Sequence, residues 1–484
     1  MNFNEMSLLT DFYELTMMQG YYVTDVKNKI VVFDLFYRIN PSENGYAIAA
    51  GLEQAIEYIK NLKFSEDDIE YLKSLHTFSD EFIHYLEQFH FTGEIYAIPE
   101  GTVVFPHEPL MRVKAPIMEA QLVETALLNI INHQSLIATK AARVVWAAQG
   151  DPVMEFGLRR AQGPDAGTYG ARAAVIGGCC GTSNVLTGRL FDVPIKGTHA
   201  HSWVMSFPDE LTAFREYAKL FPNACTLLVD TYNTLESGVP NAIKVFQEMK
   251  DAGIHLKNYG IRLDSGDLAY LSKKAKTMLE DAGFGDAIIS ASSDLDENLI
   301  ASLKLQGAKI SLWGVGTKLI TSDDCPAFGG VYKLAAESTE DGSFVPKIKL
   351  SNNVDKVTDP GIKKVIRIYD TKTNKIKADL IALEEETIDE TKPLKIFDAS
   401  AKWKKMNLEP GTYYTRELLI PIFIDGFCVY ESPKTMDIQA YCKKELDTLW
   451  DEHKRLKNPH IVPVDLSEKL HNLKVNLIEE ISGK

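Results

Sequence analysis

The sequence predicts an α/β protein whose central part is built on a parallel β-sheet, either open or closed into a barrel. From residue 152 onward, short apolar segments alternate with helical patterns at intervals of roughly thirty residues, as in parallel α/β sheets. Polar and glycine residues follow the carboxyl end of nearly every apolar segment, where such sheets build their sites. With 484 residues, the chain is long enough for two or three packed cores.

The expected elements of this central part are short and regularly spaced. The strands are predicted at Val153–Phe156, Pro194–Lys196, Thr226–Val229, Tyr259–Leu263, Ile288–Ser290 and Ile310–Trp313. The helices between them are predicted at Asp209–Leu220, Pro240–Ala252, Asp267–Ala282 and Asp296–Leu305.

The flanking parts have a different pattern. Residues 1–135 mix amphipathic helices with short strands and turns, at Ala50–Leu62, Ile69–Leu75 and Gly93–Val113. One long helical pattern runs from Ile117 to Ala148 and is stopped by glycine and proline. After about residue 345, strands are expected at Lys347–Leu350, Val365–Tyr369 and Ile376–Leu380, and charged helices at 421–484. The simplest partition is three regions, with 136–345 carrying the chemistry.

Composition excludes several classes of protein. A net charge of −15 disfavours a nucleic-acid partner, which would need a basic face. No apolar stretch approaches the roughly 18 to 20 residues of a membrane span, and the N-terminus lacks the pattern of a secretory signal. The six cysteines contain no C-x-x-C pair, which favours reduced thiols and a cytoplasmic location over zinc or disulfides.

The segment EFGLRRAQG, after the first central strand, carries adjacent arginines in a glycine-bearing loop. Arg159 and Arg160 there suit bidentate capture of phosphates, although a solvated basic loop is the alternative. Phe156 beside them could stack on an aromatic ligand, but a single phenylalanine is more often a core residue.

The segment KGTHAHSW places two histidines two residues apart. His199 and His201 could be metal ligands, could supply a nucleophile or proton donor, or could be structural. A metal hydrolase would need further histidines after later strands. The only histidine between Ser202 and Val345 is His255, which precedes a strand, so the metal interpretation is disfavoured.

Carboxylates follow two neighbouring strands. Asp264 and Asp267 in RLDSGDL could bind Mg²⁺ or ribose hydroxyls, and Asp267 could equally cap a helix. Arg262 at the strand end would need an anionic partner if buried. Asp230 in the segment DTYNT adds one more carboxylate to the same edge.

The segment GVGTK follows the last predicted central strand. Gly316 lets backbone N–H groups approach a phosphate closely, and Thr317 and Lys318 add donors. Taken together, these residues indicate an α/β barrel enzyme that binds phosphorylated anions with arginines, carboxylates and Mg²⁺. They do not identify the substrate.

The five segments EFGLRRAQGPDAG, KGTHAHSW, VDTYNT, RLDSGDL and GVGT, in this order, resemble the nicotinate phosphoribosyltransferase family. The resemblance runs from LTDFYELTM at the N-terminus to Asn458-Pro-His. It implies an irregular α/β barrel with a flanking α/β domain, in which residues 1–135 are joined by about 345–420. It also implies a homodimer with an active site at the subunit interface.

The resemblance further implies a reaction and roles for individual residues. Nicotinate and phosphoribosyl pyrophosphate would give nicotinate mononucleotide, the first step of NAD salvage from nicotinate, with Mg²⁺ and with ATP as co-substrate. His201 corresponds to the phosphorylated histidine of the family. The resemblance also implies contacts with the base: Tyr13 from the partner subunit and Phe156 would stack on its ring, Thr198 would lie beside it, and Arg262 would lie near its carboxylate. Phosphate groups would be held by Arg159, Gly316 and Thr317. Ribose hydroxyls or Mg²⁺ would be bound by Asp230 and Asp264.

The choice of base depends on the residue after Gly-Thr. Related nicotinamide enzymes carry an aspartate there, where this chain has His199, and the absence of that carboxylate favours the acid over the amide. The remaining alternatives are a nicotinamide or quinolinate phosphoribosyltransferase, a metal-dependent barrel hydrolase, and a catalytically silent metabolite sensor.

Overall fold

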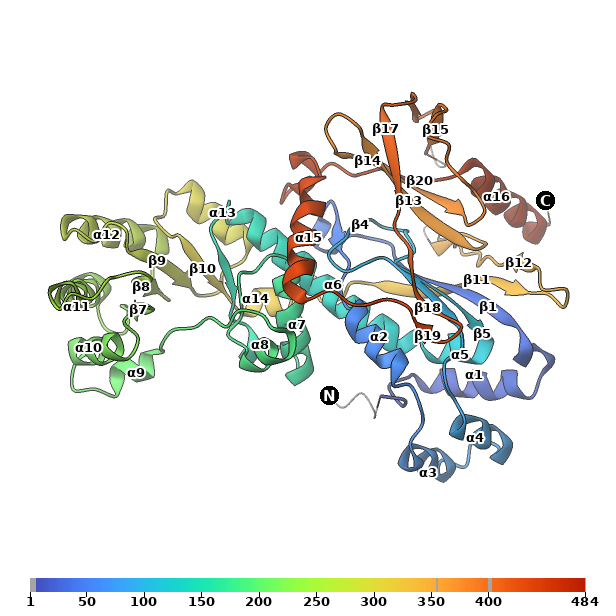
Figure 1. The fold of residues 1–484 in the computed structure, drawn as a ribbon, viewed down its shortest axis with the longest axis horizontal. Coiled ribbons are helices and arrows are strands. Elements are labelled where there is room, and N and C mark those ends of the chain that lie inside the picture. Colours follow the sequence, from blue (N-terminus) through green and yellow to red (C-terminus); the bar gives the residue numbers. More distant parts are fainter. Residues whose placement is uncertain (1–5, 354–355, 399–402, 484) are drawn as a thin grey trace. The chain divides into compact units, whose positions relative to one another are not determined.

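The computed structural model describes residues 6–353, 356–398 and 403–483 of a mixed α/β protein with several sheets (Figure 1). The chain divides into two compact units. Unit 1 comprises Met1–Leu136, Ala327–Pro433 and Ala440–Lys484, and unit 2 comprises Ile137–Pro326 and Lys434–Gln439. In the described part of the chain, no helix combines the length and the apolar character needed to cross a membrane.

Unit 1 is organised around a seven-stranded sheet whose paired strands are antiparallel. In spatial order its strands are β12 (Phe344–Pro346), β11 (Gly330–Ser338), β1 (Ile30–Tyr37), β5 (Met111–Pro116), β3 (Glu94–Ala97), β18 (Ile420–Ile424) and β19 (Phe427–Cys428). Strand β1 is buried from Val31 to Tyr37, because both of its faces are covered. Its sequence is therefore apolar at every position except Asp34, which pairs with Lys363 at 2.7 Å, and does not alternate.

Helices and short elements from the first part of the chain accompany this sheet. They are α1 (Phe12–Tyr22), η2 (Asp25–Asn28), η3 (Pro41–Glu43), α2 (Leu52–Lys60), α3 (Glu66–Ser74), α4 (Asp80–Glu87), α5 (Ile117–Leu122) and the pair β2 (Ala47–Ile48) and β4 (Val103–Val104). The predicted single helix from Ile117 to Ala148 is wrong in one respect. It consists of α5 and of α6 (Glu124–Ala147), which are separated at Val123.

A second sheet of unit 1 is formed by later parts of the chain. Its order is β17 (Tyr413–Glu417), β13 (Lys363–Asp370), β14 (Ile376–Leu383) and β20 (Val464–Leu466), with a separate hairpin of β15 (Leu394–Phe397) and β16 (Lys405–Leu408). The strand predicted at Lys347–Leu350 is wrong, since β12 ends at Pro346 and an irregular segment follows.

The predicted helical region at 421–484 also needs correction. It contains the helices α15 (Thr435–Asp447), η7 (Asp451–Lys454) and α16 (Glu468–Ser482), but most of β18 and all of β19 and β20 also lie in it, within the sheets of unit 1.

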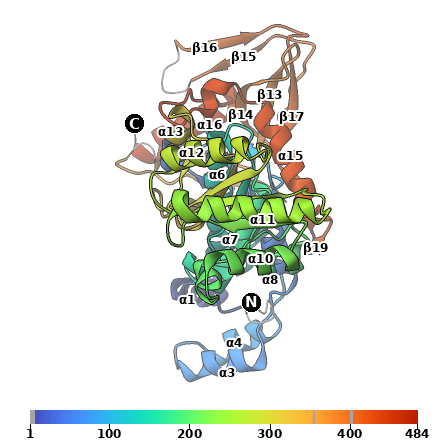
Figure 2. The same cartoon turned by 90° about the vertical axis from the view of Figure 1, so that its left-hand side faces the viewer.

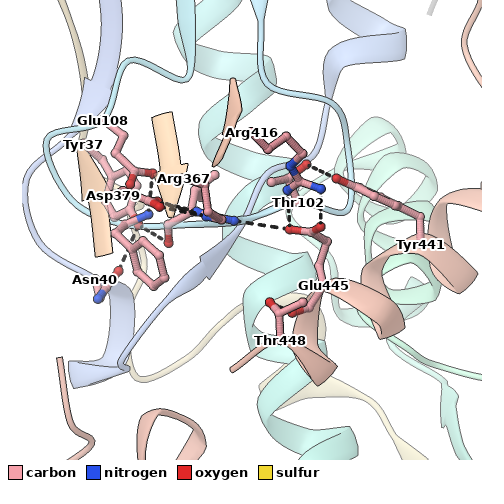
Figure 3. A network of polar contacts seen from close by, with 12 residues as sticks. Tyr37, Asn40, Thr102, Glu108, Arg367, Asp379, Arg416, Tyr441, Glu445 and Thr448 are labelled. Atoms are coloured by element: carbon pink, nitrogen blue, oxygen red, sulfur yellow. Dashed lines mark hydrogen bonds and ion pairs between the residues drawn. The ribbon is translucent and has the colours of Figure 1, made fainter. Parts of the chain in front are cut away.

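A buried ionic network connects the second sheet of unit 1 to α15 (Figure 3). Arg367 on β13 is fully buried and donates to both oxygens of Asp379 on β14 and, at 3.2 Å, to Glu445 on α15. Burial and the neighbouring Asp379 raise the pKa of Glu108 well above its ordinary value. Arg416 provides a second cation for Glu445.

Unit 2 contains the parallel sheet that the sequence predicts. The order of its strands is β6 (Val153–Glu155), β10 (Leu312–Val315), β9 (Ile288–Ser292), β8 (Tyr259–Leu263) and β7 (Cys225–Leu228). The helices that follow them include α10 (Glu210–Leu220), α11 (Val239–Asp251), α12 (Leu268–Asp281) and α13 (Glu297–Leu305). Figure 2 shows α10, α11 and α12 side by side, and Figure 1 shows them beside the edge of the sheet that carries β7 and β8.

Aspartates begin three of these helices. The side chains of Asp209, Asp267 and Asp296 accept from backbone N–H groups three residues further on and so cap α10, α12 and α13. Asp267, for which the sequence left a ligand or a cap open, has the geometry of a cap. The remaining elements of unit 2 are η4 (Leu158–Arg160), α7 (Pro164–Ile176), α8 (Val185–Phe191), α9 (His201–Met205), η5 (Thr234–Gly238) and α14 (Thr317–Ile320).

The parallel sheet continues beyond β6 through single bridges. Glu155 pairs with Thr182, and Thr182 pairs with Ile195, so the predicted strand at Pro194–Lys196 is reduced to one bridge residue. Within the described residues, backbone pairing does not join the Ile195 segment to β7 at the opposite edge. A side chain links them instead, because the Leu228 N–H on β7 donates to His199 Nε2 at 3.2 Å.

Candidate active site

A cavity of about 430 Å³ opens at the carboxyl ends of the parallel strands of unit 2. Its lining brings together the segments that the sequence singled out. The lining residues are Phe156, Arg159, Arg160, Ser183, Gly197, Thr198, His199, Ala200, His201, Arg262, Asp264, Ser292, Ser293, Asp294, Gly314, Gly316 and Thr317. The edge of a parallel sheet at its carboxyl ends is where α/β proteins bind their ligands.

A buried carboxylate stabilises the start of the arginine loop, the segment after β6 that carries Arg159 and Arg160. Glu155 at the end of β6 accepts from the Gly157 N–H and, at 2.6 Å, from the Thr182 hydroxyl. Burial raises the pKa of Glu155, and these two donors oppose that rise. The loop that follows places Arg159 and Arg160 in the cavity wall with exposed side chains. The hydrogen bonds of Glu155 thus fix the start of the loop that carries the guanidinium groups of Arg159 and Arg160.

Phe156 is positioned by a glycine on the neighbouring strand. A Cβ at Gly314 on β10 would lie 2.8 Å from two ring carbons of Phe156, closer than real Cβ contacts come. The ring therefore packs directly on the β10 backbone and presents its remaining surface to the cavity, where an aromatic ligand could stack.

Arg262 is largely buried at the end of β8. One terminal nitrogen donates to the Thr198 hydroxyl, and Nε is buried with no hydrogen-bond partner. Burial lowers the pKa of Arg262, while the carboxylates of Asp264 and Asp230 oppose this shift. A buried guanidinium with an unused donor is a site for an anion, because a bound carboxylate or phosphate would complete its hydrogen bonds.

His199 has a structural environment, although it also lines the cavity. Its side chain is buried, its ring packs edge-on against Tyr217 at 4.6 Å, and its Nε2 accepts from the Leu228 N–H. Nδ1 lies 3.4 Å from the Ala200 carbonyl oxygen. Burial lowers the pKa of His199 to about 4, so the imidazole is neutral near pH 7.

His201 begins α9 and is half-exposed in the cavity wall. Its Nδ1 lies 3.0 Å from Thr231 Oγ1, and its Nε2 lies 3.7 Å from Asp264 Oδ2. The two histidines therefore differ, since both nitrogens of His199 face backbone atoms whereas His201 faces side chains and the cavity.

Asp230 supports the cavity without lining it. Its Oδ2 accepts from the Asp264 N–H at 2.8 Å and from the Ser265 hydroxyl at 2.7 Å. Its Oδ1 is buried without a hydrogen-bond partner. Asp264 itself accepts from the Ser292 hydroxyl. An unused carboxylate oxygen next to a second carboxylate suits a hard cation that takes oxygen ligands.

The glycine segment after β10 places Gly316 and Thr317 in the cavity wall at the start of α14. The prediction that Lys318 adds a donor finds no support, because its Nζ pairs with Asp296 at 2.9 Å and the residue does not line the cavity.

Tyr13 lies on α1 in unit 1 and is about half exposed. Burial and the adjacent Glu14 raise the pKa of its phenol. It is not part of the cavity lining.

Sequence reasoning missed Ser183, Ser292, Ser293 and Asp294. Ser293 and Asp294 have φ angles of 120° and 36°, which non-glycine residues rarely adopt. They directly follow β9, so the rule that polar residues at strand ends build the site would have found them.

Among the described residues, no cluster of three or more histidine, cysteine, aspartate or glutamate side chains is arranged to hold a metal ion.

Three family models match successive parts of the chain. They describe the nicotinate phosphoribosyltransferase N-terminal domain at residues 8–132, the nicotinate phosphoribosyltransferase family at 152–326 and the corresponding C-terminal domain at 362–474.

The similarity to individual proteins extends over more than nine-tenths of their length. A nicotinate phosphoribosyltransferase of Bacillus subtilis is 48% identical over 481 residues, which are 99% of this chain and 97% of that protein. One from Caenorhabditis elegans is 36% identical over 96% of this chain and 92% of its own length. The crystal structure of human nicotinic acid phosphoribosyltransferase superposes with a TM-score of 0.83 at 29% identity, covering 97% of this chain and 100% of that one. The chain therefore belongs to the nicotinate phosphoribosyltransferase family.

Proposed function

We propose that the chain joins nicotinate to phosphoribosyl pyrophosphate, with release of pyrophosphate, and that ATP drives the reaction through a phosphohistidine. The observation that carries this proposal is the single cavity shared by Arg159, Thr198, His201, Arg262 and Thr317. It combines donors for several anionic groups with one half-exposed histidine.

The base would lie between Phe156 and Arg262. The flat ring of Phe156 offers a stacking surface, and the unused Nε–H of Arg262 is a donor for the nicotinate carboxylate. Unlike an aspartate at this position, the neutral ring of His199 carries no negative charge that would repel this carboxylate. Nicotinamide, which lacks the charge, would gain less from Arg262.

The phosphate groups would bind Arg159, Arg160, Gly316 and Thr317, where guanidinium and backbone N–H donors face the cavity. Magnesium fits the unused oxygen of Asp230 and the carboxylate of Asp264, together with substrate oxygens. When bound, the ion would neutralise the departing pyrophosphate.

The remaining work of the protein is positioning and electrostatics. As the bond from ribose C1 to pyrophosphate breaks, C1 becomes positively charged and the pyridine nitrogen attacks it from the opposite face. Asp230 and Asp264 would hold the ribose hydroxyls or the cation near this charge, and Arg262 and Phe156 would fix the ring.

His201 would accept the γ-phosphoryl group of ATP, and hydrolysis of the phosphohistidine would pull the condensation forward. The half-exposed ring lines the same cavity as the arginines that would hold phosphates, which supports this role.

Three larger-scale features complete the proposal. Unit 2 would be the catalytic domain; its main stretch, Ile137–Pro326, falls within the predicted range 136–345. In this proposal its parallel sheet would be the wall of an irregular barrel, which the hydrogen bond between the Leu228 N–H and His199 Nε2 supports at one edge. The protein acts as a homodimer in which Tyr13 of the second copy covers the base, and the free cysteines suit the reducing cytoplasm.

The central test is a steady-state assay of nicotinate, nicotinamide and quinolinate, each with and without ATP. We expect nicotinate mononucleotide as the main product and stimulation by ATP. In the His201→Ala variant, ATP stimulation should disappear while some ATP-independent synthesis remains. Preferred turnover of another base, or full ATP stimulation of the variant, would contradict the proposal.

The shared site has its own test. Tyr13→Ala should weaken nicotinate binding, and mixing this variant with Arg262→Gln should restore part of the activity, because some mixed sites would then contain both intact residues. Mixed dimers without recovery would count against Tyr13 acting in the second copy.

A further inference from the structure

Two neighbouring strands of unit 2 end in segments that line the cavity. Ser293 and Asp294 follow β9, and Gly316 and Thr317, the glycine segment, follow β10 and lead into α14. A helix of four residues has little stability of its own, so the position of α14 depends on its contacts with other elements. Whatever holds α14 in place therefore also holds the glycine segment.

One set of contacts joins α14 to the arginine loop. Ile320 on α14 is buried, and a Cβ added at Gly157 in the loop would overlap its side chain. Gly316 also lies close to the loop, since a Cβ there would be 3.2 Å from the Phe156 carbonyl oxygen. This connection consists of apolar packing and close backbone approach.

A second connection is an ion pair between α14 and α13. Lys318 Nζ lies 2.9 Å from Asp296 Oδ2, and Oδ1 of the same carboxylate accepts from the Leu299 N–H at 2.7 Å. Although burial acts to raise it, the pKa of Asp296 is lowered by the Leu299 N–H and by Lys318. The hydrogen bond to Asp296 in turn raises the pKa of Lys318, so both groups are charged at neutral pH.

A buried cluster fixes the α13 end of this ion pair. Glu297, the residue after Asp296, is fully buried and pairs with Lys140 at 2.8 Å and with Arg143 at 3.0 Å. Lys140 also pairs at 2.7 Å with Asp324, which follows α14 in the chain. The start of α13 is thus tied to α6 and to the segment after α14.

We propose that Lys318 and Asp296 are positioning residues that hold the glycine segment where it contacts the phosphate groups of the phosphoribosyl donor. The inference rests on the proposed function, in which this segment binds phosphates. Neither Lys318 nor Asp296 is part of the cavity lining, so both act through the segment. Without their ion pair, α14 would keep its packing on the arginine loop but lose its link to α13, and the spacing of the two lining segments would no longer be fixed.

The test uses full-length variants that remove either end of the ion pair. Lys318→Met keeps an unbranched side chain without its charge, and Lys318→Arg keeps a cation that can reach Asp296. Asp296→Asn removes the negative charge and keeps a side chain that caps helices well. Lys304→Met is the matched control, because Lys304 pairs with Asp151 before β6, at the amino ends of the strands and away from the cavity.

The measurements are KM for phosphoribosyl pyrophosphate, KM for nicotinate, and the direct binding of inorganic pyrophosphate by calorimetry. We expect Lys318→Met and Asp296→Asn each to raise KM for phosphoribosyl pyrophosphate roughly three- to five-fold, the size of a partly exposed ion pair. Pyrophosphate binding should weaken by a similar factor. KM for nicotinate should stay close to that of the unmodified protein, as should every value for Lys318→Arg and Lys304→Met.

The sign of the Asp296→Asn effect separates positioning from simple electrostatics. One variant removes a cation near the phosphates and the other removes an anion, so a change in potential alone would weaken binding in Lys318→Met and strengthen it in Asp296→Asn. Loss of the ion pair weakens binding in both. The double variant should then bind no more weakly than the weaker single variant, because either change already removes the interaction.

Several results would overturn the inference alone. These are tighter pyrophosphate binding in Asp296→Asn, an equal rise of both KM values, and Lys318→Met values that match the control. If Asp296→Asn folds poorly, the comparison of Lys318→Met with Lys318→Arg decides, because the Lys318 side chain is 33% exposed and equal losses in both would exclude the ion pair. An unmodified protein that binds neither pyrophosphate nor phosphoribosyl pyrophosphate would overturn the proposed function as well.

Discussion

Arg262 is the side chain that we expect to select nicotinate over nicotinamide. Its Nε is buried without a partner, and its terminal nitrogen is tied to Thr198. Replacing it with glutamine removes the charge and keeps a polar group. We expect Arg262→Gln to lose about 1.5 to 3 kcal/mol of binding to the nicotinate carboxylate, a rise in KM of roughly ten- to a hundred-fold.

Steady-state kinetics with nicotinate and nicotinamide check this expectation, and the preference for the acid should shrink with the rise in KM. Arg215→Gln is the control, because Arg215 pairs with Glu248 outside the cavity. An unchanged KM for nicotinate in Arg262→Gln would place the carboxylate elsewhere.

His199 gives the protein a dependence on pH that can be measured. Its pKa is lowered to about 4, so the folded chain keeps it neutral where an unfolded histidine, with a pKa near 6.5, takes up a proton. The free energy of unfolding therefore falls as the pH drops from about 6.5 toward 4. At pH 5 the loss from this residue is ~2 kcal/mol relative to pH 7.

Urea unfolding of the unmodified protein and of His199→Gln at both pH values isolates this contribution. The variant should lose less stability between pH 7 and pH 5. His453 also has a pKa lowered to about 4, but it is present in both proteins and cancels in the difference. Parallel losses in the two proteins would show that His199 is not the group responsible.

At the scale of elements, the periodic pattern of unit 2 is predictable. Strand β8 has the predicted bounds, the bounds of β6, β7, β9 and β10 lie within two residues of the predicted ones, and α10 to α13 each begin within one residue of the expected position. Parallel strands buried on both faces read as short apolar runs, and acidic caps mark their helices.

The antiparallel core of unit 1 is much harder to read. The sequence pattern assigns neither β1 nor β11, which pair although they are 300 residues apart, with a register shift between Val32 and Phe33. No local pattern specifies a partner at that distance. The strand predicted at Lys347–Leu350 does not form, because β12 ends at Pro346 and only the Lys347 N–H continues the pairing, donating to the Ala335 carbonyl oxygen at 2.7 Å.

The candidate site likewise contains residues that the sequence pattern predicts and others that it does not. The rule of polar strand ends finds Phe156, Thr198, His201, Arg262 and Thr317, all of which line the cavity. It cannot tell that Lys318 turns away to Asp296, because that ion pair joins α14 to the residue before α13. Side-chain direction at a strand end depends on neighbouring elements, which the motif does not contain.

The packing of β10 against the arginine loop makes a prediction at this scale. Gly314→Ala would place a methyl group 2.8 Å from the Phe156 ring, which must move toward the cavity. We expect KM for nicotinate to rise roughly ten-fold while overall stability falls by about 1 to 3 kcal/mol, the usual range for overpacking. Enzyme kinetics and thermal unfolding test the two effects.

Gly285→Ala serves as the control for that substitution. Its added methyl group would lie 3.2 Å from Cγ of the Glu280 side chain and, at ordinary contact distance, 3.9 Å from the Glu280 Cα. If Gly314→Ala bound nicotinate as well as this control, Phe156 would not be a surface of the base site.

At the scale of the whole molecule, unit 1 is assembled from three separate stretches of chain, and the ionic network around Arg367 joins parts of them. Arg367 and Asp379 lie on neighbouring strands, Glu108 belongs to the first stretch, and Glu445 to the last. A buried cation with two carboxylates contributes little net energy while it is intact, because desolvation offsets the attraction. Removing Arg367 leaves Asp379 buried and uncompensated, whereas Glu445 keeps Arg416 as a partner.

Arg367→Met should therefore destabilise unit 1 by about 3 to 5 kcal/mol, measured by urea or thermal unfolding of the full chain. Lys392→Met, which breaks an exposed pair with Asp389, should cost less than about 1 kcal/mol.

The double variant Arg367→Met with Asp379→Leu separates charge from packing. Because it removes the uncompensated carboxylate while Arg416 still neutralises Glu445, it should recover part of the loss. If the double variant is no more stable than Arg367→Met, the cost lies in the packing of the guanidinium against Phe105, which its centre approaches to 5.2 Å, and not in the charges that join the three stretches.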